Sequence, residues 1–206
     1  MRPYLIDLLE RLAIQEPAMN SDDSVAWHAH REAEQLSDLS LVEDVDAFLT
    51  SNPPRRERAA AYFVLGSIGR NCGAPECARM LIEYASTEKD KYALSSLLDR
   101  LAENPKPAHI DLGPLFDLLK DKRWLVRHAA IRSLMNTSSP EAEERLLALL
   151  GSSTDPDDLI YCHATLNRIG TPKSLVALRA NLTSRKRDIK LSAAAAIEAI
   201  EARNGR

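Results

Sequence analysis

The sequence predicts an all-α fold made of repeated two-helix units, and three observations support this. The chain of 206 residues has only seven glycines and 5% aromatic residues, a composition that favours helices. A short helical pattern recurs along it, with starts at positions 57, 90, 126, 158 and 189. These starts lie 33, 36, 32 and 31 residues apart, a period that is typical of stacked helix–turn–helix repeats.

The recurring pattern keeps its apolar residues in fixed columns. Eight residues after each start stands an aliphatic residue: Leu65, Leu98, Leu134, Leu166 and Ile197. Four residues after each start stands a small or apolar one: Ala61, Leu94, Ala130, Cys162 and Ala193. A spacing of four places both columns on one helix face. Because one two-helix unit is too thin to bury this face, neighbouring units are expected to stack.

A second series of helices is predicted between these first-series helices. The second-series stretches are 75–86, 111–121, 140–152 and 172–184. Three of the four begin with Pro, which is tolerated at the first helical position because its missing N–H would have no partner there. The segment 51–206 is therefore predicted to be an array of about four and a half repeats.

Residues 1–50 do not keep the period and are predicted to form a divergent, acidic helical cap. Helical stretches are expected around 3–15, 24–37 and 41–50. This segment has 11 acidic and 3 basic residues, a charge of −8, whereas residues 51–206 have 19 and 24, a charge of +5. A terminal unit with a polar outer face is typical of a repeat array, and an acidic docking surface is the alternative interpretation.

Composition limits the functional classes. The net charge of −3, with 45% hydrophobic and 28% charged residues, is ordinary for a globular protein and too acidic for a typical nucleic-acid binder. Three cysteines without framework spacing favour reduced thiols. No apolar window is long enough to span a membrane, and the N-terminal stretch lacks the apolar centre of a signal peptide. We therefore expect a cytoplasmic protein.

The repeated residues resemble the HEAT-repeat family, particularly the short bacterial repeats named after phycobilisome lyases. The family pattern Val-Arg-x-x-Ala-Ala-x-x-Leu is matched by Val126-Arg127, Ala129-Ala130 and Leu134. Leu65-Gly66 and Ile68-Gly69 match the Gly-x-Ile-Gly that often follows it. The resemblance covers about residues 54–203 and implies a right-handed α-solenoid.

A basic column follows the starts and is interpreted as structural. It contains Arg58, Lys91, Arg127 and Lys190, with Leu159 as the exception. In HEAT repeats this Arg usually pairs with an Asp across the stack. The resemblance places that acid five residues before each start, where Asp121 is the only acidic residue in this chain, so a continuous ionic ladder is not expected.

Three classes of enzyme have similar scaffolds. No His is followed by Glu, which argues against an iron site like that of deoxyhypusine hydroxylase. Alkylpurine DNA glycosylases would need aromatic residues and an Asp on a basic concave face, and Tyr84 and Phe116 fall in the apolar register instead. Bilin lyases share only the Ala60–Gly66 stretch. We predict a non-enzyme without cofactor or metal, and keep the glycosylase and lyase as alternatives.

Two surfaces are candidates for binding a partner. The first is the concave face, which in the HEAT family is formed by second-series helices. Its predicted partner-binding residues alternate in charge: Glu76, Arg79, Glu83, Asp117, Lys120, Glu144, Arg145 and Arg179. A mixed-charge surface suits a protein or peptide, since a phosphate backbone would favour one sign.

The second candidate surface is the ridge where first-series helices begin. Its basic residues would follow an acidic polymer such as nucleic acid: Arg55, Arg56, Lys89, Lys122, Arg123, Arg185, Lys186 and Arg187. Trp124 stands in a column that is otherwise polar or Pro, so it is predicted to face solvent and to anchor a partner. The sequence thus predicts a protein-interaction module, with nucleic-acid binding by the ridge as the alternative.

Overall fold

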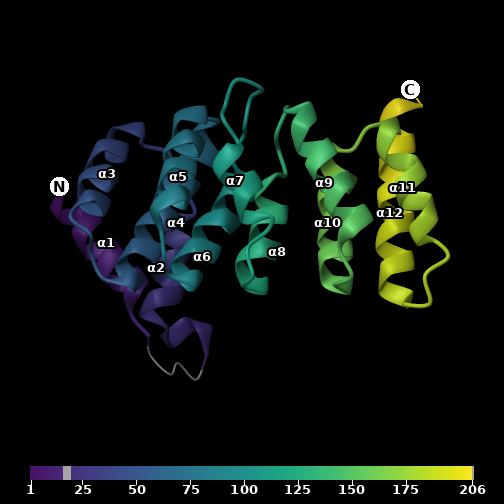
Figure 1. The fold of residues 1–206 in the computed structure, drawn as a ribbon. Coiled ribbons are helices and arrows are strands. Elements are labelled where there is room, and N and C mark those ends of the chain that lie inside the picture. Colours follow the sequence, from purple (N-terminus) through teal and green to yellow (C-terminus); the bar gives the residue numbers. More distant parts are fainter. Residues whose placement is uncertain (16–19, 206) are drawn as a thin grey trace. The chain divides into compact units, whose positions relative to one another are not determined.

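The computed structural model describes residues 1–15 and 20–205, which form two compact units, Met1–Pro105 and Lys106–Arg206. Regular structure in the described residues consists of helices, with one isolated bridge between Lys106 and Thr137. Each unit is a set of helices packed in pairs (Figure 1). The predicted all-α architecture is therefore present in both units.

The described residues of the first unit, 1–15 and 20–105, form six α-helices. They are α1 (Pro3–Ala13), α2 (Val25–Ala33), α3 (Val42–Thr50), α4 (Arg55–Cys72), α5 (Pro75–Thr87) and α6 (Lys91–Glu103). Helices α1 and α3 both pack on α4, so residues 1–50 fold together with the first repeat. Helix α4 in turn packs on α5 and α6. The helices expected around 3–15, 24–37 and 41–50 are confirmed, and their role as a cap stays a prediction.

In the second unit, the described part of the chain, 106–205, forms six more α-helices. They are α7 (Gly113–Leu118), α8 (Trp124–Ser133), α9 (Pro140–Ser152), α10 (Pro156–Ile169), α11 (Leu175–Asn181) and α12 (Arg187–Asn204). First-series helices pack in sequence, α8 on α10 and α10 on α12. Each also packs on a second-series helix, which gives the pairs α7–α8, α9–α10 and α11–α12 (Figure 1).

Helix starts follow the local chemistry of the sequence. The carboxylates of Asp90 and Asp155 accept N–H groups from the first turns of α6 and α10. Pro75 and Pro140 occupy the first positions of α5 and α9. Pro172 instead begins a short 3₁₀ turn, Pro172–Ser174, before α11. The predicted stretch 172–184 is thus divided, and its α-helical part is shorter than expected.

The predicted columns form the core of both units. Every residue of the column four after the starts is buried: Ala61, Leu94, Ala130, Cys162 and Ala193. In the other column, Leu65, Leu98, Leu134 and Leu166 are fully buried. Ile197 of α12 is only half-buried, whereas Ile200, three residues later in the same helix, is fully buried.

Two glycines of α4 allow close helix contacts. A Cβ at Gly66 would lie 2.5 Å from the Cβ of Arg100 in α6, and one at Gly69 would lie 2.6 Å from the Cβ of Cys77 in α5. Any larger side chain would push the neighbouring helices apart. The Gly-x-x-Gly spacing therefore holds α4 close to both of its partners.

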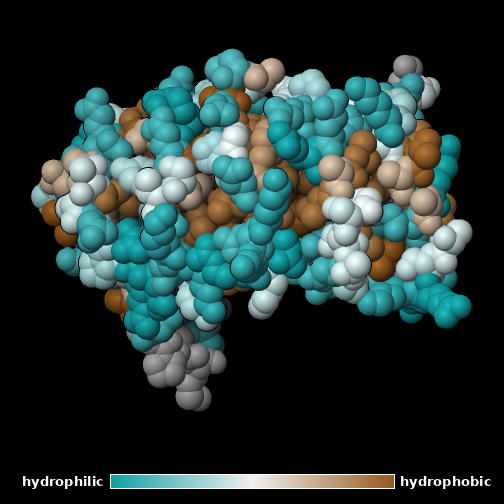
Figure 2. All heavy atoms as spheres, in the orientation of Figure 1, coloured by the Kyte–Doolittle hydropathy of each residue, from teal (hydrophilic) through white to brown (hydrophobic). Residues whose placement is uncertain are grey.

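Hydrophilic residues cover most of the face in Figure 2, with hydrophobic residues showing between them. Large exposed apolar side chains include Trp124, Tyr92 and Val176. None of the described helices is both long enough and apolar enough to cross a membrane.

Candidate binding surfaces

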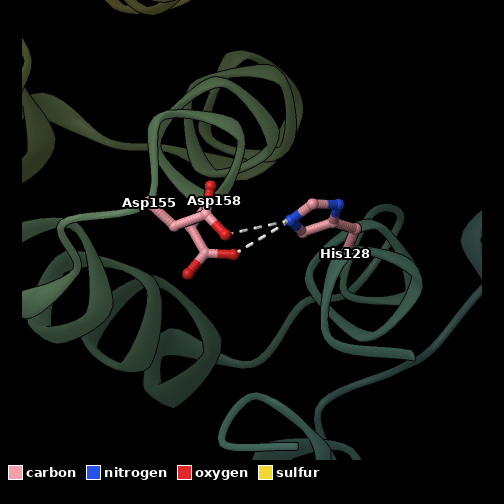
Figure 3. Close-up of side chains that lie close together, drawn as sticks. All are labelled: His128, Asp155 and Asp158. Carbon is pink, nitrogen blue, oxygen red and sulfur yellow. Dashed lines mark ion pairs between the residues drawn. The ribbon is translucent and has the colours of Figure 1, made fainter. Parts of the chain in front are cut away.

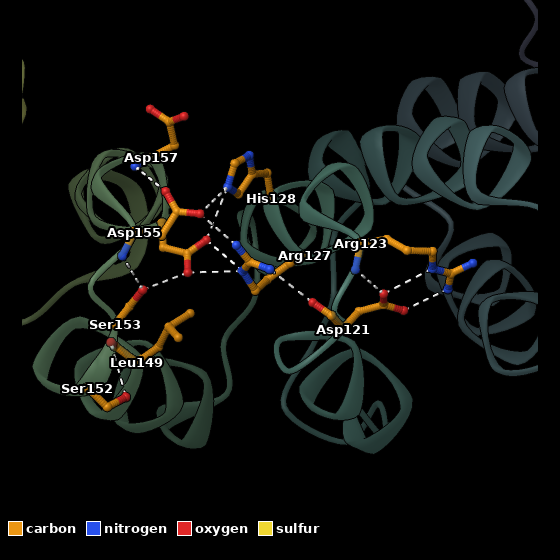
Figure 4. Close-up of polar contacts among 10 residues, drawn as sticks. Asp121, Arg123, Arg127, His128, Leu149, Ser152, Ser153, Asp155 and Asp157 are labelled. Atoms are coloured by element: carbon orange, nitrogen blue, oxygen red, sulfur yellow. Dashed lines mark hydrogen bonds and ion pairs between the residues drawn. The ribbon is translucent and has the colours of Figure 1, made fainter.

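A partly buried ion-pair network in the second unit surrounds Arg127 of α8 (Figure 4). Its Nε donates to Asp158 Oδ1 at 2.8 Å, and its Nη2 donates to Asp155 Oδ2 at 2.7 Å. Its Nη1 donates to the backbone carbonyl of Asp121 at 3.0 Å. One guanidinium thus joins the loop before α8 to the start of α10 in the next repeat.

Arg58 makes the equivalent contacts in the first unit. Its Nε and Nη2 donate to the two carboxylate oxygens of Glu88 at 2.7 and 2.9 Å, and its Nη1 donates to the Pro53 carbonyl at 2.8 Å. The Tyr62 hydroxyl adds a bond to Glu88 at 3.1 Å. We call each of these two arrangements, around Arg58 and around Arg127, an inter-repeat clamp. The structural interpretation of the basic column is confirmed for Arg58 and Arg127.

The position expected for the acidic partner is wrong. The Asp121 carboxylate binds Arg123, at 2.7 Å from its Nη2, instead of Arg127. The acids of the clamp come from the next repeat, just before or at its start. Lys91 and Lys190, the other members of the basic column, are exposed.

The clamp and its surroundings change the pKa values of several acids. Burial opposes ionisation of Glu88, but hydrogen bonds from Arg58 and from the Asp90 N–H outweigh it, so the pKa of Glu88 is lowered. The N–H of Asp157, with the positive charge of Arg127, lowers the pKa of Asp155. Hydrogen bonds from Arg123 lower the pKa of Asp121. These carboxylates are therefore held ionised as structural partners.

His128, Asp155 and Asp158 form a group whose donor atoms lie within 4.8 Å of one another (Figure 3). His128 Nε2 is 3.1 Å from Asp158 Oδ1 and 3.9 Å from Asp155 Oδ2. Imidazole and carboxylate groups could hold a divalent cation such as Zn²⁺. The guanidinium of Arg127 already donates to both carboxylates, however, and partly neutralises them. We therefore assign the group to the clamp.

Sequence analysis missed this group because its members are 27 and 30 residues from His128 and form no metal-binding motif. The repeat period contains the signal that could have identified this group. His128 directly follows the basic column, and the two acids stand three residues before the start of the next repeat and at that start, position 158.

Trp124, the first residue of α8, is 63% exposed, as its polar column predicts. Its ring centroid lies 5.7 Å from that of His128, which in turn stacks on Tyr161 at 4.6 Å with an interplanar angle of 25°. Trp124 therefore lies on the ridge at one end of a row of three rings, Trp124, His128 and Tyr161. Its role as a partner anchor stays a prediction.

Helix α7, the loop before it and the first half of α9 line an open hollow of about 390 Å³. We call it the α7–α9 hollow; it is lined by Ala108, Ile110, Asp111, Leu112, Gly113, Phe116, Asp117, Lys120, Ser139, Glu141 and Arg145. It brings together three of the predicted partner-binding residues, Asp117, Lys120 and Arg145. Arg145 donates to Glu141 at 2.7 Å, and its guanidinium lies 5.4 Å from the Phe116 ring centroid. The expectation that Phe116 is a core residue is wrong in part, because its ring is only half-buried and lines this hollow.

The other predicted partner-binding residues are exposed but lie outside this hollow. Glu144 is on α9, and Arg179 of α11 pairs with Glu201 of α12 at 2.8 Å. In the first unit, α5 presents Glu76 and an Arg79–Glu83 pair at 2.5 Å. Each unit therefore has its own mixed-charge second-series surface.

The ridge differs between the two units. In the second unit, basic Lys122 and Arg123 precede α8, and acidic Asp155 and Asp157 stand at the start of α10. Basic residues return at the start of α12, at positions 185–187. In the first unit, Arg55 and Arg56 open α4, and Lys89 lies before α6. Sequence analysis missed the exposed Tyr92, which stands beside these bases, because its column is buried or half-buried in most other repeats.

A family model described as HEAT repeats matches residues 78–160 and again residues 112–198. Together the matches span 78–198, more than half of the 206 residues. The chain belongs to the HEAT-repeat family. Its fold class is accordingly an all-α solenoid of HEAT helix–turn–helix repeats. None of the curated proteins matches this HEAT-repeat chain.

Solved structures are similar to this HEAT-repeat chain in fold. One is an engineered protein, a target of the Northeast Structural Genomics Consortium. The similarity covers 98% of this chain and 98% of the engineered chain, with 18% sequence identity and a TM-score of 0.53. Another is the designed armadillo repeat protein YIII(Dq)4CqI. The similarity covers 94% of this chain and 98% of the designed chain, with 14% sequence identity and a TM-score of 0.48. The likeness to the engineered protein concerns the fold alone.

Proposed function

We propose that this HEAT-repeat protein is a non-catalytic binding module that takes a segment of another protein on the α7–α9 hollow. The observation that carries the proposal is the meeting of Asp117, Lys120 and Arg145 beside the half-buried Phe116 ring. An apolar ring among charges of both signs offers both contact area and selectivity for a peptide.

The charges of the hollow favour a peptide over a nucleic acid. Its lining contains three carboxylates, Asp111, Asp117 and Glu141, and two cations, Lys120 and Arg145. A phosphate backbone would be repelled by the excess of carboxylates. An alkylpurine glycosylase would likewise need a basic concave face, so the hollow does not favour that alternative.

Site-specific cross-linking tests the proposal. Asp117 is replaced by the photoreactive residue p-benzoylphenylalanine, and the exposed Glu198 of α12 is replaced in the same way as a control. We expect one protein to be cross-linked from position 117 in native lysate and not from position 198. Equal cross-linking from both positions would show only non-specific contact.

The captured partner then allows a quantitative test. We expect Lys120→Glu with Arg145→Glu to weaken its binding at least tenfold, because two charges of the hollow are reversed. The matched control reverses two exposed charges of first-series helices, Arg168→Glu with Lys190→Glu. A similar loss in both double variants would contradict the assignment of the site.

A further inference from the structure

A second hollow, in the first unit, differs from the α7–α9 hollow in the sign of its charge. It has a volume of about 520 Å³ and lies where α4 and α6 begin. We call it the Tyr92 hollow; it is lined by Gln15, Arg55, Arg56, Ala59, Tyr92 and Ala93. Its lining thus contains two guanidinium groups and, among the described residues, no carboxylate.

The aromatic ring of this hollow is presented to solvent between cations. Tyr92 is 55% exposed, so its ring contributes little to the core. The guanidinium carbon of Arg55 lies 5.3 Å from the ring centroid, and the Lys91 ammonium nitrogen lies 4.9 Å from it. Both cations lie over the ring, so a nucleobase can stack on it where the exposed Arg55 side chain turns from the ring to a phosphate.

The start of α4 adds hydrogen-bond donors to the same place. Arg55 is its first residue, and no side chain caps this helix at Pro54. The first N–H groups of a helix have no intrahelical partner and carry the positive end of its dipole, so they favour an anion. Helix α6 differs, since the Asp90 carboxylate already accepts the N–H groups of Tyr92 and Ala93.

Of the nearby acids, Glu57 lies in the first turn of α4 itself, and Asp90 and Glu88 lie just before α6. Asp90 is 4.0 Å from Arg55, a loose pair, and Arg56 donates to the uncharged Gln15 side chain. Glu88, the remaining strong acid before α6, is buried and held by Arg58.

An apolar hollow of about 300 Å³ adjoins this site and shares Gln15, Arg56 and Ala59 with it. Its other lining residues include Leu12, Ile14 and Phe63, and it too has no carboxylate among the described residues. The two hollows together place cations, an exposed aromatic ring and apolar surface side by side.

We propose that the Tyr92 hollow binds a nucleoside phosphate, with the base stacked on Tyr92 and the phosphate held by Arg55 and Arg56. Guanidinium groups bind phosphate oxygens in a bidentate manner, which explains two arginines at one helix start. The nucleoside phosphate is either a free nucleotide or one unit of a single strand. This activity is separate from peptide binding at the α7–α9 hollow and goes beyond it.

Binding is measured with two probes. Fluorescence anisotropy follows a labelled ten-nucleotide single-stranded RNA, and calorimetry follows AMP. Binding of AMP assigns the site to free nucleotides, and binding of the oligonucleotide alone assigns it to single strands. Absence of binding by both probes at millimolar concentration would overturn the proposal.

Four variants locate the site. We expect Tyr92→Ala to weaken binding of the active probe about tenfold or more, and Tyr92→Phe to retain it, because stacking needs only the ring. Arg55→Gln with Arg56→Gln should weaken binding and reduce its salt dependence. The control, Arg168→Gln with Lys190→Gln, removes the same charge from exposed positions of first-series helices in the second unit, outside the ridge, and should change binding less than twofold.

Three results would contradict the proposal. One is equal loss in the control and in the Arg55/Arg56 double variant, which would indicate non-specific attraction to basic surface. Another is unchanged binding by Tyr92→Ala. The third is competition by a heptaglutamate peptide as strong as that by AMP, since a plain polyanion would then satisfy the site.

Discussion

Removal of the Arg127 side chain tests the inter-repeat clamp. Arg127 is 16% exposed and its main partner Asp158 is 4% exposed, so the pair is largely shielded from water. Removing one member of a buried ion pair costs about 3–5 kcal/mol, because the other charge stays buried without its partner. Ser153 still donates to Asp158 at 2.7 Å, and Asp155 can rehydrate at 35% exposure. We therefore expect Arg127→Ala to lower the free energy of unfolding by about 3 kcal/mol, the lower end of that range.

The matched control is Arg145→Ala. Arg145 also pairs with a carboxylate at 2.7 Å, but both side chains are about half exposed. An exposed pair at this helical spacing contributes about 0.3–0.5 kcal/mol, so the control should change stability little.

Urea unfolding followed by tryptophan fluorescence measures both variants. The chain has two tryptophans, so a Trp27→Phe background leaves Trp124, in the second unit, as the reporter. A double-mutant cycle with Asp158→Asn should give a coupling energy of about 2 kcal/mol. A loss in Arg127→Ala no larger than in Arg145→Ala, or full additivity in the cycle, would refute the clamp.

Three further predictions concern charge and packing. Because the Arg58 guanidinium lowers the pKa of Glu88 below its ordinary 4.5 despite burial, the carboxylate stabilises the fold above that pH. The stability difference between the wild type and Glu88→Gln, measured by urea unfolding, should therefore shrink as the pH falls from about 5 to 3; a constant difference would contradict this. Burial lowers the pKa of His163 from 6.5 to about 4, so the unfolded chain binds the extra proton and stability should fall as the pH drops through this range. His163→Leu should flatten that slope, which is at most about 1.4 kcal/mol per pH unit, and an unchanged slope would assign it to other groups. Gly69→Ala should lower the free energy of unfolding by about 1–3 kcal/mol, since the added Cβ would meet Cys77 at 2.6 Å; calorimetry showing an unchanged melting temperature would refute the close contact.

The core was predictable from sequence because its residues obey the helical and repeat periods together. Ala61 and Leu65 are buried for the same reason as Ala130 and Leu134 one or more repeats later. A column that is apolar in every repeat has only one stable place, between stacked helices. The half-buried Ile197 departs from this rule because no further helix packs on the outer face of α12 among the described residues.

The polar contacts were less predictable because they depend on loop geometry. The acid that binds Arg58 stands two residues before a repeat start, and the one that binds Arg127 stands at the start. No single column of the repeat contains both acids. The column five residues before each start contains only Asp121 as an acid, and its carboxylate binds Arg123 instead of Arg127.

The two hollows could not be located from sequence for a related reason. Exposure of Phe116 depends on the length of α7, which has only 6 residues where its neighbour α9 has 13. Tyr92 is the second residue of α6 and stands beside the start of α4, where it is 55% exposed. The apolar register predicted a core position for Phe116, whereas no position was predicted for Tyr92.

Hydrogen exchange of the backbone amides, with and without the captured partner, tests the proposed binding surface most directly. We expect the partner to slow exchange in residues 113–118 and 140–145, the segments that line the α7–α9 hollow, and to leave the N-terminal turns of α10 and α12 unchanged. Protection confined to those turns, with none at α7 and α9, would contradict the assignment of peptide binding to second-series helices.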